Sequence, residues 1–232
     1  MAMKTIGLVG GTTPESTRIY YDLLIRGARR PGGDPLRNPV IIVYSLDLAE
    51  LVKTQRTGER AEVGAYLAEI LESLRHAGAE LGALTANTPH SYLEEILTRT
   101  SLPLVSIVSA TRDAARDRGL ERALLLGTRT TMEGDMYPRA FAEAWLHIVT
   151  PGAGDREFLD TVIYGELALG IVRPEVRQRI LDICTGHIEA DGVDSVILGC
   201  TELPLVISGD DLPVAVLDTT TIHVAAILAA AS

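Results

Sequence analysis

The sequence contains few of the residues from which metal sites and disulfide frameworks are built. Only two of its 232 residues are cysteines, Cys184 and Cys200, and neither lies in a Cys-x-x-Cys or Cys-x-x-His pattern. We therefore expect no disulfide framework and no zinc site. No apolar run approaches the roughly 18 residues that a membrane-spanning helix needs. The first residues also lack the apolar segment of a signal peptide, so we expect a cytoplasmic protein with no membrane partner.

Basic residues are also scarce. The chain has 21 Lys and Arg against 31 Asp and Glu, which gives a formal net charge of −10 at pH 7. Phosphate backbones need clustered Lys and Arg, so nucleic acid is not an expected partner. An acidic ligand stays compatible with this charge, because backbone N–H groups and hydroxyls bind carboxylates locally.

Several common enzyme motifs are absent as well. The glycines near the N-terminus, Gly7, Gly10 and Gly11, do not have the G-x-G-x-x-G spacing of a dinucleotide-binding loop, and no Walker A pattern occurs. No G-x-S-x-G elbow is present either, which argues against a serine hydrolase.

Short apolar segments alternate with helix-like segments along the whole chain. Residues 5–9, 39–46, 81–84 and 103–108 have the pattern of strands in the first half, and residues 122–126, 145–149, 195–198 and 214–217 do so in the second. Aromatic residues make up only 4% of the chain, so the core must consist mainly of Leu, Ile, Val and Ala. This alternation predicts an α/β fold with parallel sheets and helices on both of their faces.

The two halves of the sequence are similar in layout. Each begins with a strand and a Gly–Thr turn, at Gly10–Thr17 and at Gly127–Glu133. Each later has a strand that ends in small polar residues, at Ala86-Asn87-Thr88 and at Cys200-Thr201-Glu202. We therefore predict two similar α/β subdomains, residues 1–115 with 213–232 and residues 116–212, with the active site in the cleft between them. The first is expected to include the last strand and helix of the chain.

Each polar cluster has an ordinary interpretation beside the functional one. Ligands of open α/β sheets bind at the carboxyl ends of the strands, where both clusters are expected. However, Asn87-Thr88 is also typical of a capped turn, and Gly10-Gly11 of a plain tight turn. A free cysteine is more often a small buried hydrophobe, which is the interpretation we favour for Cys184. Cys200 differs because polar residues follow it directly.

Taken together, these motifs resemble those of the aspartate/glutamate (Asp/Glu/hydantoin) racemase family, and most closely its members specific for L-aspartate and L-glutamate. The resemblance extends from Lys4 almost to the C-terminus. It is carried by Glu15-Ser16-Thr17 with Tyr20-Tyr21, Gln55-Arg56, Ala86-Asn87-Thr88, Leu126-Gly127-Thr128-Arg129, Thr131-Met132-Glu133 with Asp135, Leu198-Gly199-Cys200-Thr201-Glu202, Asp218-Thr219 and Ile222-His223.

The resemblance implies proton transfer at Cα of a small acidic amino acid, without a cofactor. In the family, two residues from opposite halves act as base and acid, usually as a thiolate and a thiol, and Cys200 matches one of them. The family's substrate-binding positions correspond to Thr12, Gln55, Asn87, Thr88, Thr128, Thr131 and Thr201, while Glu202 is expected to position the amine or Cys200. The resemblance also implies a homodimer.

Ala86 departs from the family pattern. Relatives carry cysteine, or sometimes threonine, at this position, and a methyl group carries no proton. Neighbouring side chains on a strand point to opposite faces, so Thr85 is not expected to substitute. Three interpretations stay open: a racemase impaired at Ala86, a one-thiol decarboxylase or lyase of the same superfamily, and a non-catalytic relative that binds a small acid. Ser106 stands where many relatives carry histidine, and we assign it no role.

Overall fold

The computed structural model describes residues 3–29, 36 and 38–232, and it has two compact units. One consists of Met1–Ile107 with His223–Ser232, and the other of Val108–Ile222. The last strand, β7 (Ala215–Asp218), pairs with β6 (Ser195–Leu198) in the sheet of the second unit. The sequence-based division placed residues 108–115 and 213–222 in the first subdomain, whereas both segments belong to the second unit. For residues 213–222 the physical reason is the pairing of β7 by backbone hydrogen bonds, which completes the second sheet.

The sheet of the first unit has three parallel strands in the order β2-β1-β3. They are β1 (Ile6–Gly10), β2 (Ile41–Ser45) and β3 (Leu81–Leu84). The fourth strand predicted over residues 103–108 is reduced to a single bridge between Gly82 and Leu104, and α5 (Ile107–Asp117) begins three residues later. Pro103 has no backbone N–H to donate to a ladder, which limits strand pairing there.

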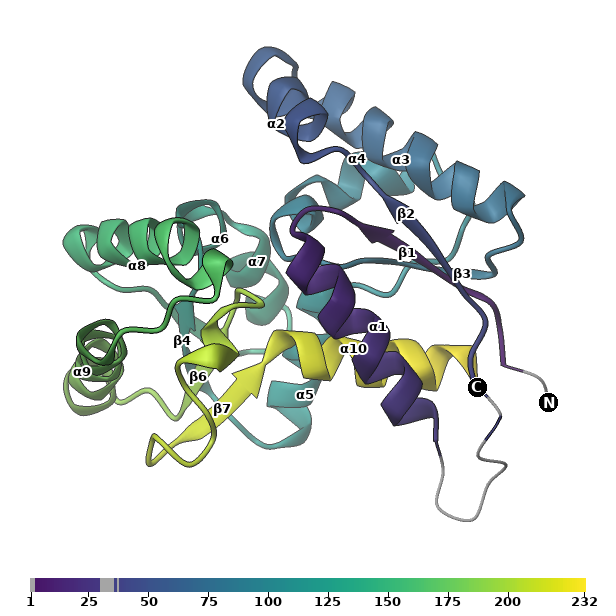
Figure 1. Ribbon diagram of the computed structural model, residues 1–232. Coiled ribbons are helices and arrows are strands. Elements are labelled where there is room, and N and C mark those ends of the chain that lie inside the picture. Colours follow the sequence, from purple (N-terminus) through teal and green to yellow (C-terminus); the bar gives the residue numbers. More distant parts are fainter. Residues whose placement is uncertain (1–2, 30–35, 37) are drawn as a thin grey trace. The chain divides into compact units, whose positions relative to one another are not determined.

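Helices cover both faces of this first sheet, as Figure 1 shows. Apolar residues of β1 and β3 on one face pack against α3, and those on the other face pack against α1 and α10. The elements besides the strands are α1 (Pro14–Ala28), α2 (Leu48–Thr57), α3 (Arg60–His76), the 3-10 helix η1 (Thr88–Tyr92), α4 (Leu93–Leu97) and, from the end of the chain, α10 (Thr219–Ala231).

The sheet of the second unit has four parallel strands in the order β5-β4-β6-β7. Its first two strands in the chain are β4 (Arg122–Leu126) and β5 (His147–Val149). The remaining elements are α6 (Arg129–Glu133), α7 (Met136–Ala142), α8 (Ala153–Gly165), η2 (Leu167–Leu169), α9 (Pro174–Asp191) and η3 (Leu203–Leu205). Leucines and valines of β4 and β6 pack against α8 and α9, and the fully buried Cys184 belongs to this core. The parallel α/β architecture predicted from the sequence is confirmed for both sheets.

Local sequence signals explain several helix boundaries. The Thr13 side chain accepts a hydrogen bond from the Ser16 N–H at 3.2 Å, with Pro14 in the first turn, as the N-cap pattern predicts. Gly78 follows α3 with φ +104°. Only glycine adopts that left-handed backbone without strain, so the residue ends the helix.

Candidate functional site

Cys200 lies just beyond the carboxyl end of β6, at a point where the backbones of β6 and β4 are in close contact. The Gly199 N–H donates to the Leu126 carbonyl of β4 at 2.7 Å. A Cβ on Gly199 would stand 2.7 Å from that same carbonyl oxygen. Glycine is therefore required immediately before the thiol, because any side chain would push β6 away from β4.

The Cys200 thiol is hydrogen-bonded to a buried carboxylate. Its Sγ lies 2.8 Å from Oε2 of Glu202, and the Thr201 hydroxyl donates to the same oxygen at 2.8 Å. Thr201 and Glu202 are 7% and 5% exposed, whereas Cys200 is only partly buried. The thiol, hydroxyl and carboxylate thus form one local network in which the carboxylate accepts from both neighbours.

This environment favours the protonated thiol. Burial, the negative charge of Glu202 and the hydrogen bond to its carboxylate together raise the pKa of Cys200 well above its usual range. Each cause disfavours the thiolate, because a thiolate beside a carboxylate is a like-charge pair in a partly dry site. In the structure as it stands, Cys200 is therefore a proton donor.

We predict that Glu202→Gln will lower the pKa of Cys200. The amide removes the negative charge but keeps a similar shape, so burial alone would still oppose the thiolate. The alkylation of Cys200 by iodoacetamide, followed by mass spectrometry between pH 6 and 10, should become several-fold faster at neutral pH, since the thiolate is the nucleophile. Cys184, 0% exposed, serves as the internal control. An unchanged or slower reaction at Cys200 would show that Glu202 does not hold the thiol protonated.

Thr128 and Thr131 lie beside the loop that carries Cys200. Both are buried, and their hydroxyls are 3.2 Å apart. A Cβ on Gly127 would meet the Gly199 carbonyl oxygen at 3.1 Å and the Thr131 side chain at the same distance. The loops after β4 and β6 are therefore in contact, which brings these two threonines together with Cys200, Thr201 and Glu202 within the second unit.

Sequence reasoning missed two residues of α8 that hold this loop. The Asp160 carboxylate accepts from the Arg129 N–H at 2.6 Å, and one turn later the Tyr164 hydroxyl is hydrogen-bonded to Thr128. Tyr164 keeps 62% of its surface exposed. The only sequence signal was their four-residue spacing on a helix whose other face, with Leu159, is apolar. That pattern is common on surface helices and carries little information by itself.

The charges near Cys200 also affect the pKa of Tyr164. Partial burial, followed by the negative charges of Asp160, of Cys200 once it is ionised, and of Glu202, raises the pKa of Tyr164, while the hydrogen bond with Thr128 opposes the rise. The phenol of Tyr164 is therefore neutral at physiological pH.

The candidate residues of the first unit gather at the carboxyl edge of its sheet. Thr12 follows β1, and Ala86, Asn87 and Thr88 follow the neighbouring parallel strand β3. Ala86 and Thr88 are half-buried, whereas Asn87 is 4% exposed. Gln55 does not belong to these loops; it is half-buried on α2, which follows β2.

The side chain of Thr85 is buried inside the first unit and does not reach this edge, as the alternation of side chains along a strand predicts. Its side chain is fully buried, and its hydroxyl donates to the Val9 carbonyl of β1 at 3.1 Å. Its own carbonyl accepts a hydrogen bond from the Ser16 hydroxyl. Thr85 is therefore a structural link between β1, β3 and α1, and it offers no hydroxyl in place of the one that Ala86 lacks.

Two buried histidines are hydrogen-bonded to the backbone of the first unit, and one of them, His90, is bonded at Ala86. His90 Nδ1 donates to the Ala86 carbonyl at 2.8 Å, and its Nε2 accepts from the Ile107 N–H at 3.2 Å. His223 Nε2 donates to the Val105 carbonyl at 2.9 Å, so its Nδ1 accepts from the Tyr20 hydroxyl at 2.8 Å. Because carbonyls only accept and amides only donate, these partners fix one neutral tautomer for each ring.

Acid is expected to destabilise the first unit through this histidine pair. Burial lowers the pKa of His90 to about 4, and burial with the neighbouring His90 lowers that of His223 to about 3. An unfolded histidine titrates near 6.5, so below that pH the unfolded chain binds more protons than the folded one. Stability is thus fully present above about pH 6.5 and falls as the pH drops toward 4, by up to about 1.4 kcal/mol per pH unit for each ring.

Urea unfolding at several pH values between 5 and 7 checks this expectation. His223→Gln should unfold at lower urea than the wild type at pH 7 but show a shallower pH dependence, because one titrating ring is gone. A slope that is identical in the two proteins would rule out His223 as a source of the acid sensitivity.

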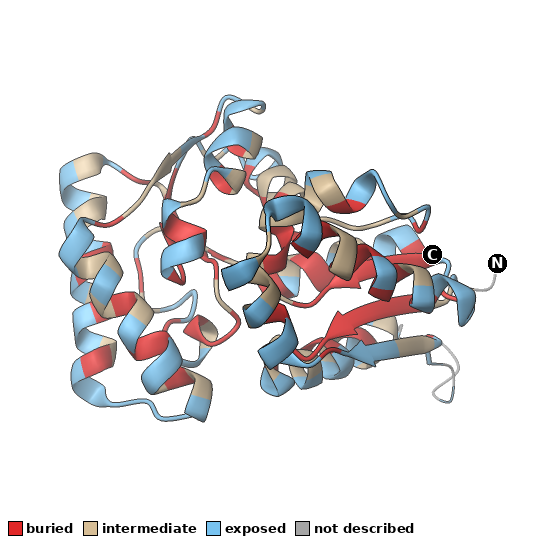
Figure 2. Cartoon of the chain, turned by 90° about the horizontal axis from the view of Figure 1, so that it is seen from above, coloured by how far each residue is buried: buried red, intermediate tan, exposed pale blue. Residues whose placement is uncertain are grey.

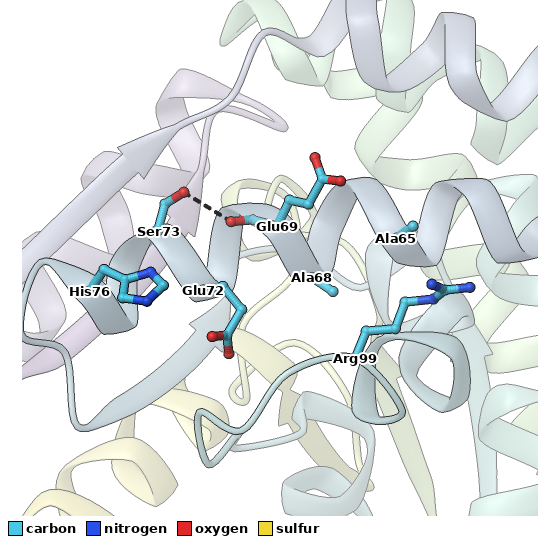
Figure 3. A pocket seen from close by; sticks show the side chains of 7 residues that line it. All are labelled: Ala65, Ala68, Glu69, Glu72, Ser73, His76 and Arg99. Atoms are coloured by element: carbon cyan, nitrogen blue, oxygen red, sulfur yellow. Dashed lines mark hydrogen bonds between the residues drawn. The ribbon is translucent and has the colours of Figure 1, made fainter.

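The hollow shown in Figure 3 is a separate surface feature of the first unit. It lies along α3 and is lined by Ala65, Ala68, Glu69, Glu72, Ser73, His76 and Arg99. Hydrogen bonds from Arg75, Thr100 and Ser101 lower the pKa of Glu72 to about 2. The carboxylate thus already has its partners, and none of the residues predicted from the sequence lines this hollow.

Neither a metal cluster nor a membrane span is found in the part of the chain that the structure describes. No three His, Cys, Asp or Glu side chains among residues 3–29, 36 and 38–232 are grouped so that they could hold a metal ion. Among the same residues, no helix is both long and apolar enough to cross a membrane.

Curated relatives match part of the chain. A glutamate racemase from Mycobacterium leprae is 29% identical over 149 residues, which are 62% of this chain and 52% of that protein. The chain thus spans about half the length of this relative.

Solved structures match over almost the full length. A candidate Asp/Glu racemase from Yersinia pestis is 36% identical, with a TM-score of 0.91 and 99% of both chains covered. An aspartate racemase homologue from Pyrococcus horikoshii OT3 is also 36% identical, with a TM-score of 0.88 and the same coverage. The profile of the Asp/Glu/Hydantoin racemase family matches residues 9–227. The chain therefore belongs to the Asp/Glu/hydantoin racemase family.

Proposed function

We propose that this chain transfers the Cα proton of a small acidic amino acid, aspartate or glutamate, without a cofactor. The observation that carries the proposal is the partly exposed Cys200 thiol at the carboxyl end of β6, hydrogen-bonded to the buried Glu202 carboxylate at 2.8 Å. Membership of the racemase family supports the same chemistry.

In this proposal Cys200 carries the proton on one face of Cα. As a thiolate it takes the Cα proton and leaves an enediolate on the substrate, and as a thiol it returns the proton. The raised pKa of Cys200 favours the thiol in the empty site, so the base form needs compensation. A substrate ammonium bound beside Glu202 would offset the carboxylate charge and make the thiolate accessible.

Hydroxyl and amide groups supply the remaining interactions in the proposal. The enediolate concentrates negative charge on the substrate carboxylate, and oriented donors stabilise such charge more in the transition state than in the ground state. The second unit offers the hydroxyls near Cys200, and the first unit offers those after β1 and β3. We assign substrate binding to Thr12, Gln55, Asn87, Thr88, Thr128, Thr131, Thr201 and Glu202.

Ala86 limits what this chemistry can achieve. Inversion at Cα needs a proton carrier on each face, and the family position for the second carrier holds a methyl group here. With Cys200 alone, a proton removed from one enantiomer returns to the same face. We therefore predict that the chain exchanges the Cα proton of one enantiomer with solvent faster than it inverts that carbon.

The test is incubation of each enantiomer of aspartate and glutamate in deuterated water. Proton NMR measures loss of the Cα signal, and chiral chromatography measures inversion. Exchange of one enantiomer that exceeds inversion at least tenfold supports the proposal. This margin is conservative because it lies below the roughly 10²–10⁴-fold worth of a general acid or base. Inversion that keeps pace with exchange would mean that another group replaces the carrier missing at Ala86.

A decarboxylase is the second candidate, and Ala86 is the observation that favours it. One thiol suffices to reprotonate a carbanion formed by loss of carbon dioxide, because the proton has to reach only one face of the carbon. Release of carbon dioxide from a malonate-type acid, lost in Cys200→Ala, would favour this function over racemisation. Binding of an acid without turnover, unaffected by Cys200→Ala, would instead favour a non-catalytic relative.

We also propose a cytoplasmic homodimer that binds neither nucleic acid nor membrane. The net charge of −10 supports the absence of nucleic-acid and membrane binding, because phosphate surfaces repel an acidic protein. The homodimer rests on resemblance within the family, and sedimentation of the chain, whose monomer mass is 24.9 kDa, tests it.

A further inference from the structure

Three hydroxyl groups of the second unit are hydrogen-bonded in a row from its core to its surface. The Thr128 hydroxyl lies 3.2 Å from that of Thr131, and the Tyr164 hydroxyl of α8 is hydrogen-bonded to Thr128. Thr131 is 0% exposed, Thr128 6% and Tyr164 62%. Figure 2 shows buried residues in red and exposed residues in pale blue along the same helices, and α8 combines both kinds in this way. Thr128 thus connects a hydroxyl in the core with one at the surface.

Thr131 donates the hydrogen bond that it shares with Thr128. Either oxygen could be the donor on distance alone, but the Thr131 hydroxyl has no other acceptor among the residues that the structure describes. Buried donors are rarely left without an acceptor, because a buried donor has lost the hydrogen bond that it made with water. The Thr128 oxygen therefore accepts from Thr131.

Tyr164 is also a donor toward Thr128. The phenol is neutral at physiological pH, and its aromatic ring makes the hydroxyl a stronger donor and a weaker acceptor than the hydroxyl of threonine. A hydroxyl oxygen has two lone pairs, and those of Thr128 are then both occupied. The O–H group of Thr128 remains as a donor, and the described part of the chain offers no acceptor for it.

The loop between β4 and α6 lies against the segment that precedes Cys200. A Cβ on Gly199 would stand 3.1 Å from the Thr131 Cγ2 atom, so the two loops are in contact. The Asp160 carboxylate of α8 accepts from the Arg129 N–H at 2.6 Å and fixes the backbone of the β4–α6 loop. Helix α8 therefore holds both the backbone of this loop and its hydroxyl group.

We propose that Tyr164 is a positioning residue, which acts through Thr128 by making that hydroxyl a donor to a carboxylate of the substrate. Carboxylate oxygens only accept hydrogen bonds, so they match a hydroxyl that can only donate. A donor that is oriented in advance does not have to be ordered when the substrate binds. The inference rests on the proposed function, which assigns substrate binding to Thr128, and it adds that α8 sets the direction of that donor.

Calorimetric titration with L-aspartate and L-glutamate tests the role of the phenol. Tyr164→Phe leaves the Thr128 proton free to rotate, so the Kd should rise about three- to tenfold, which corresponds to roughly one hydrogen bond. Tyr44→Phe is the matched control, because it removes the phenol of a tyrosine on β2 that is also exposed, at 42%, and it should leave the Kd unchanged. An unchanged Kd in Tyr164→Phe would overturn the inference.

A double-mutant cycle with Thr128→Val separates positioning from a general structural role. If the phenol acts through Thr128, Tyr164→Phe should change the Kd less than about twofold once the threonine hydroxyl is gone, since the two effects are coupled. An equal rise in both backgrounds would show that Tyr164 acts by another route. Binding is measured without turnover, so binding without Cys200-dependent proton exchange would count against the proton-transfer proposal alone. A wild type that binds neither amino acid would overturn both proposals.

Discussion

Cys200→Ala is expected to reduce Cα proton exchange on aspartate or glutamate to the uncatalysed rate, a loss of about 10²–10⁴-fold. The substitution removes the one thiol that is both partly exposed and bonded to Glu202, and it changes little volume. The measurement is deuterium incorporation at Cα by NMR at saturating substrate.

Cys184→Ala is the matched control for that result. Cys184 packs in the core of the second unit among residues of α8 and α9, and burial raises its pKa to about 12. Its removal should lower stability slightly and leave exchange unchanged. Exchange that persists in Cys200→Ala, or disappears in the folded Cys184→Ala variant, would place the chemistry elsewhere.

Ala86→Cys is expected to raise racemisation of the same amino acid by about 10²–10⁴-fold, the usual worth of a positioned general acid or base. Ala86 is half-buried, and its carbonyl is already held by His90 at 2.8 Å, so the backbone that would carry a new thiol is in place. Chiral chromatography against time, from both enantiomers, measures the gain.

Thr85→Cys places the same thiol one residue earlier and controls for position. Thr85 is fully buried and bonded to β1, so a thiol there should give no gain. Equal gains from the two variants would mean that an added thiol acts nonspecifically. No gain from Ala86→Cys with either amino acid, in a folded protein, would contradict the assignment of position 86 as the second proton carrier.

Much of the fold could be predicted because its signals are local. Apolar segments bounded by polar turns located the strands of both sheets, and Thr13 and Gly78 marked helix ends through their capping chemistry. The destination of β7 could not be predicted in this way. Which sheet a strand joins depends on backbone pairing with a distant segment, and an apolar strand such as residues 214–217 fits either sheet equally well.

In the candidate site, too, residues with local sequence signals could be predicted and residues that reach the site from distant segments could not. Cys200, Thr201 and Glu202 were readable because they are consecutive and follow a buried strand. The contributions of Asp160 and Tyr164 were not, since they reach the Thr128 loop from a helix some 30 residues later, through side chains that resemble any surface pair. The sequence also left open what His90 and His223 do. Their hydrogen-bond partners show that His90 holds the Ala86 carbonyl and that His223 links Tyr20 to the Val105 carbonyl.

The most direct test of the central claim compares the wild type with the double variant Ala86→Cys/Cys200→Ala in deuterated water. If Cys200 serves one face of Cα and position 86 the other, the wild type will exchange one enantiomer and the double variant its mirror image. Exchange of the same enantiomer by both proteins, or by neither, would contradict the claim that one proton carrier is present at position 200 and the other is missing at position 86.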